Sequence, residues 1–304
     1  MPTCPLCEVR VDVHLRDVED PISRRKFDVL RCLKCGLGQT YPMPSELAPY
    51  YDGYHGARHG SSAQICINRR IAILRSSPRK REAGALLDIG CGDGSFLHAA
   101  RERGWRVFGT ELNPQQARQR GLYVVTDINE IAESAPFDCI TLWHSLEHLR
   151  DPLNVLKTIR RLLSPTGVLL IAVPDSGGLQ ATLFGRKWVH LDVPRHLYHY
   201  GKTSLSMILQ ATGFFPVQWW HQEFEYDLLG WSQSALNRIL PTPNIFFDLL
   251  MGRTPRCNQA EKGMGYLCGT ALTALAFPPL VLGTLVKRGG SLLVAAHPCE
   301  PSIL

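Results

Sequence analysis

The sequence lacks the features of an exported or repetitive protein. Its N-terminus has neither the basic stretch nor the apolar stretch of a signal peptide. We therefore expect a cytoplasmic protein, located at the inner face of a membrane if any segment touches lipid. In that compartment the ten cysteines are expected to be thiols and metal ligands, not disulfides. The chain has no internal repeat and no low-complexity tract, which excludes repeat architectures.

Charge is also scarce. Charged residues make up 20% and hydrophobic residues 45% of the 304 positions, so we expect a packed core and not disorder. The length suffices for one large α/β domain and a small module. The net charge of +6 permits a polyanionic partner such as RNA, a sugar nucleotide or an anionic lipid surface, but selects none of them.

Strands and helices alternate through the middle of the chain. This alternation predicts βαβ units and a parallel sheet. The tetrapeptide Ser164-Pro165-Thr166-Gly167 is expected to separate the helix over 152–163 from the strand that follows it. The predicted strands are 85–89, 105–110, 123–126, 137–143, 168–173, 214–220 and 290–296, and the predicted helices are 64–81, 95–103, 114–120, 152–163 and 204–212.

A glycine-rich loop follows the first of these strands, with the pattern Asp88-x-Gly90-x-Gly92-x-Gly94. Glycine lets the backbone pass close to a ligand, and the next helix offers free N–H groups at its start. Glu111 stands about twenty residues further on, where a carboxylate can accept the hydroxyls of a ribose. The glycines fall at every second position, outside the G-x-G-x-x-G frame, which disfavours a dinucleotide dehydrogenase.

Together these motifs resemble those of class I S-adenosylmethionine-dependent methyltransferases over residues 83–220. The segments that carry the resemblance are 86–96, Glu111, Asp127-Ile128, 137–140, 146–152 and 163–174. The resemblance implies a Rossmann-like α/β fold with a mostly parallel seven-stranded sheet, and S-adenosylmethionine as cofactor.

The resemblance also implies individual roles. Asp88, Gly90 and Gly92 would approach the amino-acid end of the cofactor, and Glu111 would hold its ribose. The other implied contacts are Leu112 on the adenine ring, Asp127 with Ile128 at the adenine edge, and Trp143 with His144 on the other side of the cofactor.

Three histidine and arginine side chains are candidates for catalysis. His148 ends a His144-x-x-Glu147-His148 pattern that matches one metalloprotease group, but the pattern follows a sheet strand, so a metal is disfavoured. One of the two histidines has a cofactor-side or general-base role, with His148 the better base candidate, or alternatively both are purely structural. Arg195 and His196 lie in an Asp192-x-Pro-Arg-His-Leu segment that resembles a methyltransferase subfamily. Arg195 could pair with a substrate anion and His196 could take a hydroxyl proton. The alternative is a loop anchor in which Arg195 is tied to Asp192.

Two C-x-x-C pairs stand near the N-terminus. Cys4 with Cys7 and Cys32 with Cys35 have the spacing of a tetrahedral zinc site. We predict a zinc ribbon over residues 1–45, with a structural role or, alternatively, a role in gripping substrate. A redox dithiol is the alternative chemistry.

An apolar stretch lies near the C-terminus. Residues 263–286 contain no charge and are flanked by Lys262 and Lys287. Because Pro278 and Pro279 interrupt the stretch, we expect a helical hairpin or lid within an insertion at about 222–289, and we favour peripheral membrane contact over a membrane span. The predicted organisation is thus a ribbon (1–45), a linker with an amphipathic helix (46–82) and a methyltransferase domain (83–304).

The leading functional hypothesis is a methyltransferase acting on a small molecule, with a hydroxyl of a sugar or a lipid-linked intermediate as acceptor. An rRNA or tRNA base methyltransferase that grips RNA with its ribbon is the alternative enzyme, although nucleic acid is disfavoured because no arginine- and aromatic-rich face stands out beyond the ribbon. A cofactor-binding but inactive scaffold is the alternative from another class.

Overall fold

The protein is described from a computed structural model that covers residues 2–51, 62–76, 83–255 and 257–299. Its internal contacts divide the chain into two compact units. Unit 1 comprises residues 1–62, 174–204 and 221–292, and unit 2 comprises residues 63–173, 205–220 and 293–304. The domain boundaries predicted from the sequence stay predictions.

Unit 2 contains a seven-stranded sheet in the order β10-β11-β8-β7-β4-β5-β6. The pairs β4–β5, β4–β7, β5–β6 and β7–β8 are parallel, and β10–β11 is antiparallel. The strands are β4 (Ala85–Ile89), β5 (Arg106–Thr110), β6 (Val124–Val125), β7 (Phe137–Trp143), β8 (Leu163–Pro174), β10 (Phe214–Trp220) and β11 (Ser291–Pro298). The mostly parallel seven-stranded sheet expected from the sequence is therefore confirmed.

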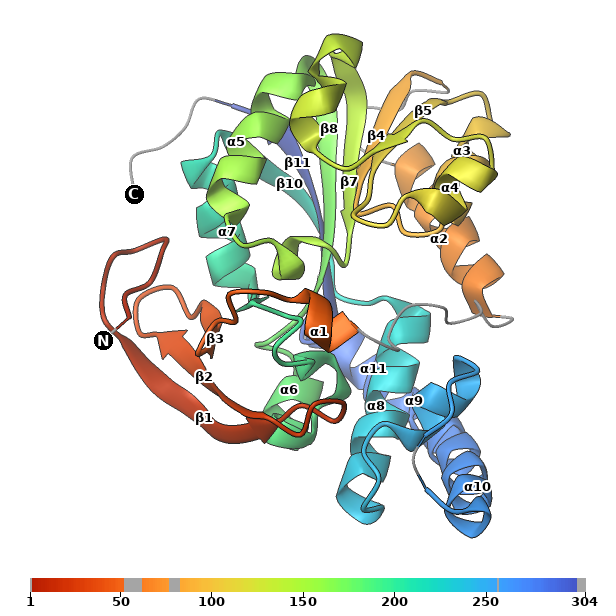
Figure 1. The fold of residues 1–304 in the computed structure, drawn as a ribbon. Helices are drawn as coiled ribbons and strands as arrows, with labels where there is room; N and C mark the ends of the chain where they lie inside the picture. The colour runs from red at the N-terminus through yellow and green to blue at the C-terminus, as the bar shows by residue number, and fades with distance from the viewer. Residues whose placement is uncertain (1, 52–61, 77–82, 256, 300–304) are drawn as a thin grey trace. The chain divides into compact units, whose positions relative to one another are not determined.

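Helices cover both faces of this sheet (Figure 1). Those on one side are α5 (Pro152–Leu162) and α7 (Lys202–Ala211), and those on the other are α2 (Ser62–Ser76), α3 (Ser95–Arg101) and α4 (Gln115–Gln119). The short 3₁₀ helices η1 (Ile128–Ser134) and η2 (Leu146–His148) follow β6 and β7. The central strands are buried on both faces, which is why they read as continuous apolar runs.

One prediction within unit 2 is wrong. Residues 164–167 do not end the preceding helix in a loop but belong to β8. Leu163 pairs with Phe137, and the register shifts before Val168 pairs with Cys139. This irregularity accommodates Pro165 and Gly167 inside the strand. The predicted helix over 64–81 ends at Ser76, and its residues 77–81 lie outside the described part of the chain.

Unit 1 contains a four-stranded sheet in the order β1-β2-β3-β9. The pairs are antiparallel, and β9 comes from a distant part of the chain, with Gly38 opposite His199. Buried Phe27 and Val29 of this sheet pack with Trp188 and Leu191. The N-terminal strands thus share a core with the segment around residue 190. The strands are β1 (Val11–Glu19), β2 (Lys26–Cys32), β3 (Gly38–Tyr41) and β9 (Tyr198–His199).

Helices make up the rest of unit 1. They include four between β10 and β11, where the sequence predicts an insertion, and three of these pack around Leu236, Ile245 and Phe246. The helices are α1 (Ala48–Tyr51), α6 (Leu179–Phe184), η3 (Gly185–Lys187), η4 (Val189–Leu191), α8 (Phe224–Ile239), α9 (Ile245–Leu250), α10 (Gln259–Leu275) and α11 (Phe277–Leu285).

The apolar stretch forms α10 and α11. No single described helix is long and apolar enough to cross a membrane, but this pair, bent by 43°, meets the criteria of length and composition together. The bend falls at Ala276, just before the proline pair that was expected to break the run.

Candidate functional site

The loop after β4 has a backbone that only glycine tolerates at Gly90. This residue has a φ of +74°, and a Cβ built there would lie 2.8 Å from the Cβ of Ser145. Ser145 is fixed in that place because its hydroxyl donates to the Ile89 carbonyl at 2.7 Å. Gly92 also has a positive φ and has open space where its Cβ would be. The loop therefore leaves its backbone accessible to a ligand.

Asp88, at the end of β4, is a buried carboxylate with a hydroxyl partner. It is 3% exposed, and its Oδ1 accepts a hydrogen bond of 2.6 Å from Thr141 on the neighbouring strand β7. Burial raises the pKa of Asp88 to about 7, although the Thr141 hydrogen bond and the positive charge of Arg70 oppose that rise. A cationic group placed beside this carboxylate would bring the pKa back down.

Glu111 follows β5 and turns back to the glycine loop. Its Oε2 accepts from the Gly92 N–H at 2.9 Å, and its Oε1 accepts from the Asn113 N–H at 3.2 Å. The neighbouring Leu112 is 81% exposed, which leaves its side chain available to pack on a flat ligand. Their contacts with a nucleoside stay predictions.

Asp127 follows β6 and caps η1. Its Oδ1 accepts from the Asn129 N–H at 2.8 Å, while Glu130 accepts from the Asp127 N–H at 2.9 Å. This reciprocal pair is a capping box and fixes the turn that leads into Ile128. Because β4, β5 and β6 are adjacent parallel strands, Asp88, Glu111 and Asp127 all lie at one edge of the sheet.

The end of β7 supplies Trp143 and His144. Trp143 is 5% exposed, and its indole N–H has no hydrogen-bond acceptor among the described residues. The guanidinium of Arg70 lies 4.9 Å from the centre of its ring. His144 has a φ of +54°, and its Nδ1 lies 3.6 Å from Oε1 of buried Glu147. His148 is half-buried at the end of η2.

Arg195, in unit 1, is buried in a network of hydrogen bonds. Its guanidinium donates to Oδ1 of Asp192 at 2.9 and 2.6 Å, to Oδ1 of Asp20 at 2.9 Å and to the Tyr50 carbonyl at 3.0 Å. The side chains of Arg195 and Asp20 are 1% and 0% exposed. This geometry favours the loop-anchor interpretation that the sequence left open.

His196 is also held from within unit 1. Its Nδ1 lies 2.9 Å from the His190 carbonyl, and its Nε2 lies 4.0 Å from Oδ2 of Asp192. The residue is 8% exposed. Its catalytic role stays a prediction.

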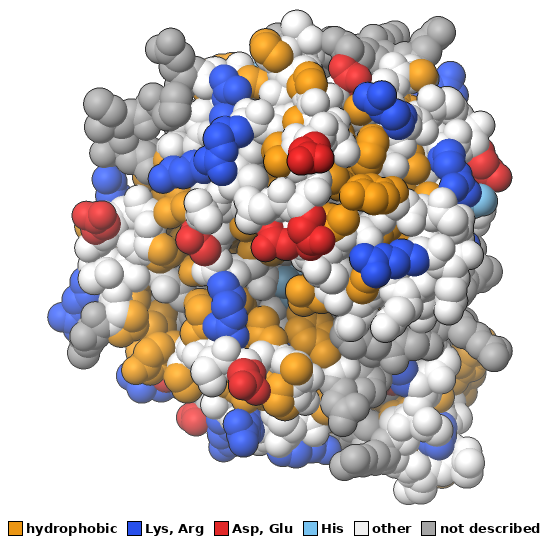
Figure 2. Space-filling model, turned by 45° about the horizontal axis from the view of Figure 1, so that its top comes forward, with side chains coloured by type: hydrophobic (Ala, Val, Ile, Leu, Met, Phe, Trp, Pro, Cys, Tyr) orange, Lys and Arg blue, Asp and Glu red, His pale blue; other side chains and the backbone are white. Residues whose placement is uncertain are grey.

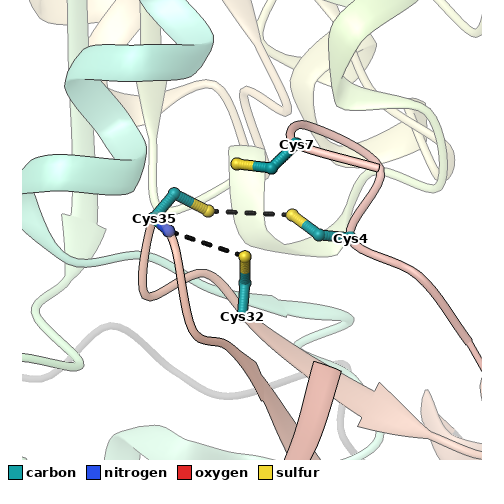
Figure 3. A group of neighbouring side chains, drawn as sticks. All are labelled: Cys4, Cys7, Cys32 and Cys35. Atoms are coloured by element: carbon teal, nitrogen blue, oxygen red, sulfur yellow. Dashed lines mark hydrogen bonds between the residues drawn. The ribbon is translucent and has the colours of Figure 1, made fainter. Parts of the chain in front are cut away.

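The four N-terminal cysteines meet in unit 1 (Figure 3), with their sulfur atoms within 4.8 Å of one another. The Sγ atoms of Cys4 and Cys35 are 3.7 Å apart, and two sulfurs that bind one tetrahedral zinc at ~2.3 Å lie roughly 3.8 Å apart. The pKa of Cys4 is lowered to about 5 because Cys35 donates to its sulfur, and the same bond raises the pKa of Cys35. The donor set therefore fits zinc.

The two cysteine pairs have the same backbone geometry. The N–H of the fourth residue after the first cysteine donates to that cysteine's carbonyl, from Glu8 to Cys4 and from Gly36 to Cys32. Glu8 and Gly36 both have a positive φ, of 59° and 75°. Two matching turns thus aim four thiols at one point, which is the arrangement of a metal-binding knuckle pair.

Comparison with known proteins decides the family. A model of the methyltransferase domain matches residues 67–218, which is half of the chain. The chain belongs to this methyltransferase family. The matched region contains the loop after β4 and each of the strand ends described above for unit 2.

Individual relatives agree with this assignment. The chain is 30% identical over 139 residues to a ubiquinone biosynthesis O-methyltransferase of Xanthomonas oryzae, a match that covers 41% of this chain and 58% of that relative. It is 28% identical over 177 residues to the enzyme of the same name from Cereibacter sphaeroides, covering 53% of this chain and 72% of the relative. A chain from the complex that contains the Haloferax volcanii Trm112 methyltransferase activator has the same fold, with a TM-score of 0.51, 16% identity, and coverage of 79% of this chain and 92% of that chain.

Sequence reasoning missed several residues that contact the candidate site. Thr141 binds Asp88, Ser145 closes on Gly90, and Arg70 stacks on Trp143. Thr141 could have been found, because it is a polar residue inside the apolar strand 137–143. Arg70 could not, because arginines are frequent on amphipathic helices and the pattern does not distinguish one from another.

Proposed function

We propose that the protein is an S-adenosylmethionine-dependent methyltransferase whose acceptor is a small molecule with a hydroxyl group, on a sugar or a lipid-linked intermediate. The observation that carries the proposal is the row of Asp88, Glu111 and Asp127 at the ends of three adjacent parallel strands. The O-methyltransferase relatives support a small acceptor, since both are named for ubiquinone biosynthesis.

Each of the candidate site residues in unit 2 would then have a distinct role. Asp88 would attract the positively charged end of the cofactor, and Gly90 and Gly92 would let it approach the backbone. Glu111 would exchange its bond with the Gly92 N–H for the ribose hydroxyls. Leu112 would cover the adenine, Asp127 and Ile128 would hold its edge, and Trp143 and His144 would close the opposite side.

The cofactor, when bound, supplies a methyl group on a cationic sulfur, so the protein's main task is alignment. His148 would accept the proton that the acceptor hydroxyl loses as its oxygen takes the methyl group. His196 is the second candidate for this base. Arg195 would act as a positioning residue, because its guanidinium is occupied by Asp20, Asp192 and Tyr50.

The function is tested with methyl-labelled cofactor and a fractionated lysate. We expect label in a fraction of small molecules or lipids, and loss of labelling in Asp88→Asn. Glu102→Gln, an exposed acidic change in the same unit, is the matched control and should keep the activity. Label in RNA would overturn the proposal in favour of the RNA enzyme, and cofactor binding with no labelled product in any fraction would favour the inactive scaffold.

The charge distribution bears on the RNA alternative. On the face drawn in Figure 2, Lys and Arg side chains are interspersed with Asp and Glu and do not form a continuous stripe. A protein that tracks a phosphate backbone needs a run of adjacent cations. This face therefore favours the small-molecule acceptor.

We infer that Cys4, Cys7, Cys32 and Cys35 bind a structural zinc ion, which would hold the N-terminal turns of unit 1 together. The purified protein should contain stoichiometric zinc by elemental analysis. Cys35→Ser should lose it and melt at a lower temperature, whereas Cys66→Ser, which changes a thiol outside the cluster, should retain it. Full metal content in Cys35→Ser would contradict the assignment.

We further propose that α10 and α11 touch an anionic membrane surface. Nine large apolar side chains are exposed on or beside this pair: Met264, Tyr266, Leu267, Leu275, Phe277, Val281, Leu282, Leu285 and Val286. Exposed apolar side chains between flanking cations suit the lipid interface.

Flotation with phosphatidylcholine vesicles, with and without phosphatidylglycerol, tests this contact. We expect binding to the anionic vesicles and its loss in a Leu267→Ser and Leu282→Ser double variant. Leu183→Ser, an exposed leucine of α6, is the control. Equal flotation of the double variant and the wild type would refute the contact, as would its absence from both kinds of vesicle.

A further inference from the structure

A hollow of about 560 Å³ lies within unit 1, and Asp192 is part of its lining. Its walls come from three stretches of the chain: the turn between β1 and β2, the segment of η3 and η4, and the end of α8 with the loop after it. A volume of this size holds a small organic molecule.

Five cations line this hollow, with three acidic residues. Two of the acids are already paired: Glu19 lies 2.8 Å from Arg24, and Asp192 binds Arg195. Asp17 is the third. The four other cations are Lys26, Arg186, Lys187 and Arg238, so positive charge is in excess.

In the part of the chain that the structure describes, these four cations have no acidic partner. Arg238 donates to the Leu183 carbonyl and stacks on Phe184, and Arg186 donates to the Arg16 carbonyl at 3.4 Å. Within the described ranges, no carboxylate lies within ion-pair distance of any of the four. Like charges gathered in one concave site repel one another, and an anionic ligand relieves that repulsion.

The rest of the lining includes aromatic side chains and hydrogen-bonded backbone. Buried Trp188 and Phe184 form part of the wall. Asn237 donates to the Lys187 carbonyl and to Oδ1 of Asn244 at 3.1 and 2.9 Å, which fixes the backbone that carries Lys187. A ligand would thus meet aromatic and backbone walls together with the cationic side chains of the lining.

We propose that this hollow binds the phosphoryl group of a small organic phosphate, with Lys187 and Arg186 as its main ligands. Guanidinium and ammonium groups are the usual partners of phosphate oxygens. The phosphate could belong to a soluble sugar nucleotide or to a lipid-linked diphosphate, which share this chemistry. The inference goes beyond the proposed methyl transfer and does not depend on it, because none of the cations belongs to unit 2.

The test is isothermal titration of the full-length protein with inorganic pyrophosphate, UDP-glucose and farnesyl diphosphate. We expect binding that weakens with salt, and about tenfold weaker binding in an Arg186→Gln and Lys187→Gln double variant. Lys157→Gln with Arg106→Gln, an exposed pair in unit 2, is the matched control. Tighter binding of UDP-glucose than of farnesyl diphosphate would identify the soluble source, and the reverse order the lipid.

Unchanged affinity in the double variant would overturn the proposal, and so would tighter binding of a short single-stranded RNA than of any of the three phosphates. Thermal unfolding of the variant verifies that its fold is intact. Cofactor binding is measured on the same samples. Loss of phosphate binding in the double variant, with cofactor binding retained, supports the phosphate site independently of the methyltransferase function. Phosphate binding by a wild-type protein that binds no cofactor would refute the methyltransferase function but not the phosphate site.

Discussion

Asp20 in unit 1 and Asp88 in unit 2 are both buried, and the two carboxylates have different partners. Asp20 in unit 1 accepts from the Arg195 guanidinium and from the backbone N–H groups of Ile22 and Ser23. Asp88 in unit 2 accepts from one hydroxyl, that of Thr141. Asp20 is neutralised by a buried cation within its own unit, whereas the positive charge that acts on Asp88 among the described residues of unit 2 is that of Arg70.

This difference separates a structural charge from a functional one. A buried carboxylate that is paired and hydrogen-bonded fixes the chain around it, and breaking the pair is costly. A buried carboxylate with a raised pKa at a strand end is a candidate for ligand binding. Substitutions at the two positions should therefore change stability in opposite directions.

The largest effect is expected for Arg195→Ala. It would leave Asp20 buried without its cation, so we expect unfolding in denaturant to require about 3–5 kcal/mol less free energy. Arg16→Ala, an exposed change on β1, should lie within ~0.5 kcal/mol of the wild type. Combining Asp20→Asn with Arg195→Met should recover part of the loss, and a double variant less stable than Arg195→Ala would show that the two charges are not coupled.

Asp88→Asn should stabilise the protein at alkaline pH. The pKa of Asp88 rises from its ordinary value of 3.8 to about 7 in the folded protein. The folded state therefore binds this proton more tightly than the unfolded state does. The stability that this proton contributes is fully present below pH 4 and is lost as the pH rises to about 7. Asp88→Asn does not undergo this loss. Its unfolding free energy should therefore exceed that of the wild type by an amount that grows from near zero at acid pH to roughly 2–4 kcal/mol at alkaline pH. A pH-independent difference between the two unfolding curves would contradict the assignment.

Cofactor affinity should fall as Asp88 becomes protonated. A cationic ligand requires the ionised carboxylate, so the proposed S-adenosylmethionine site should lose up to about tenfold in affinity per pH unit below pH 7. Titration calorimetry between pH 5 and 7 would measure this slope. Glu102→Gln should follow the same slope as the wild type, and an affinity that does not change over this range would separate Asp88 from the binding site.

The sequence predicts unit 2 better than unit 1. Strands 137–143 and 214–220 have the predicted bounds, because a buried strand between turn residues is visible locally. The strand ends also predict that Asp88, Glu111 and Asp127 lie at one edge of the sheet. Strand β8 was predicted too short, since a proline and a glycine normally end a regular element and only the register shift against β7 accommodates them.

Unit 1 depends on contacts that no local pattern encodes. Asp20 and Arg195 are 175 positions apart, and β9 is two residues long. The cysteine spacing predicted that the four thiols would meet, but not that Phe27 and Val29 would share a core with Trp188. The hollow was missed because its cations come from distant segments and are ordinary surface residues in the sequence.

The smallest effect is expected for Asp192→Asn, the second partner of Arg195. Its Oδ1 accepts two bonds from the guanidinium, yet its side chain is 12% exposed and Asp20 still neutralises the cation after the change. An amide oxygen can keep part of the hydrogen bonding, so the loss in unfolding free energy should be about 1 kcal/mol. A loss as large as that of Arg195→Ala would mean that Asp192, and not Asp20, is the main ionic partner of Arg195. The comparison between Asp20 and Asp88 would then fail, because the ion pair that stabilises unit 1 would be the partly hydrated one and not the buried one.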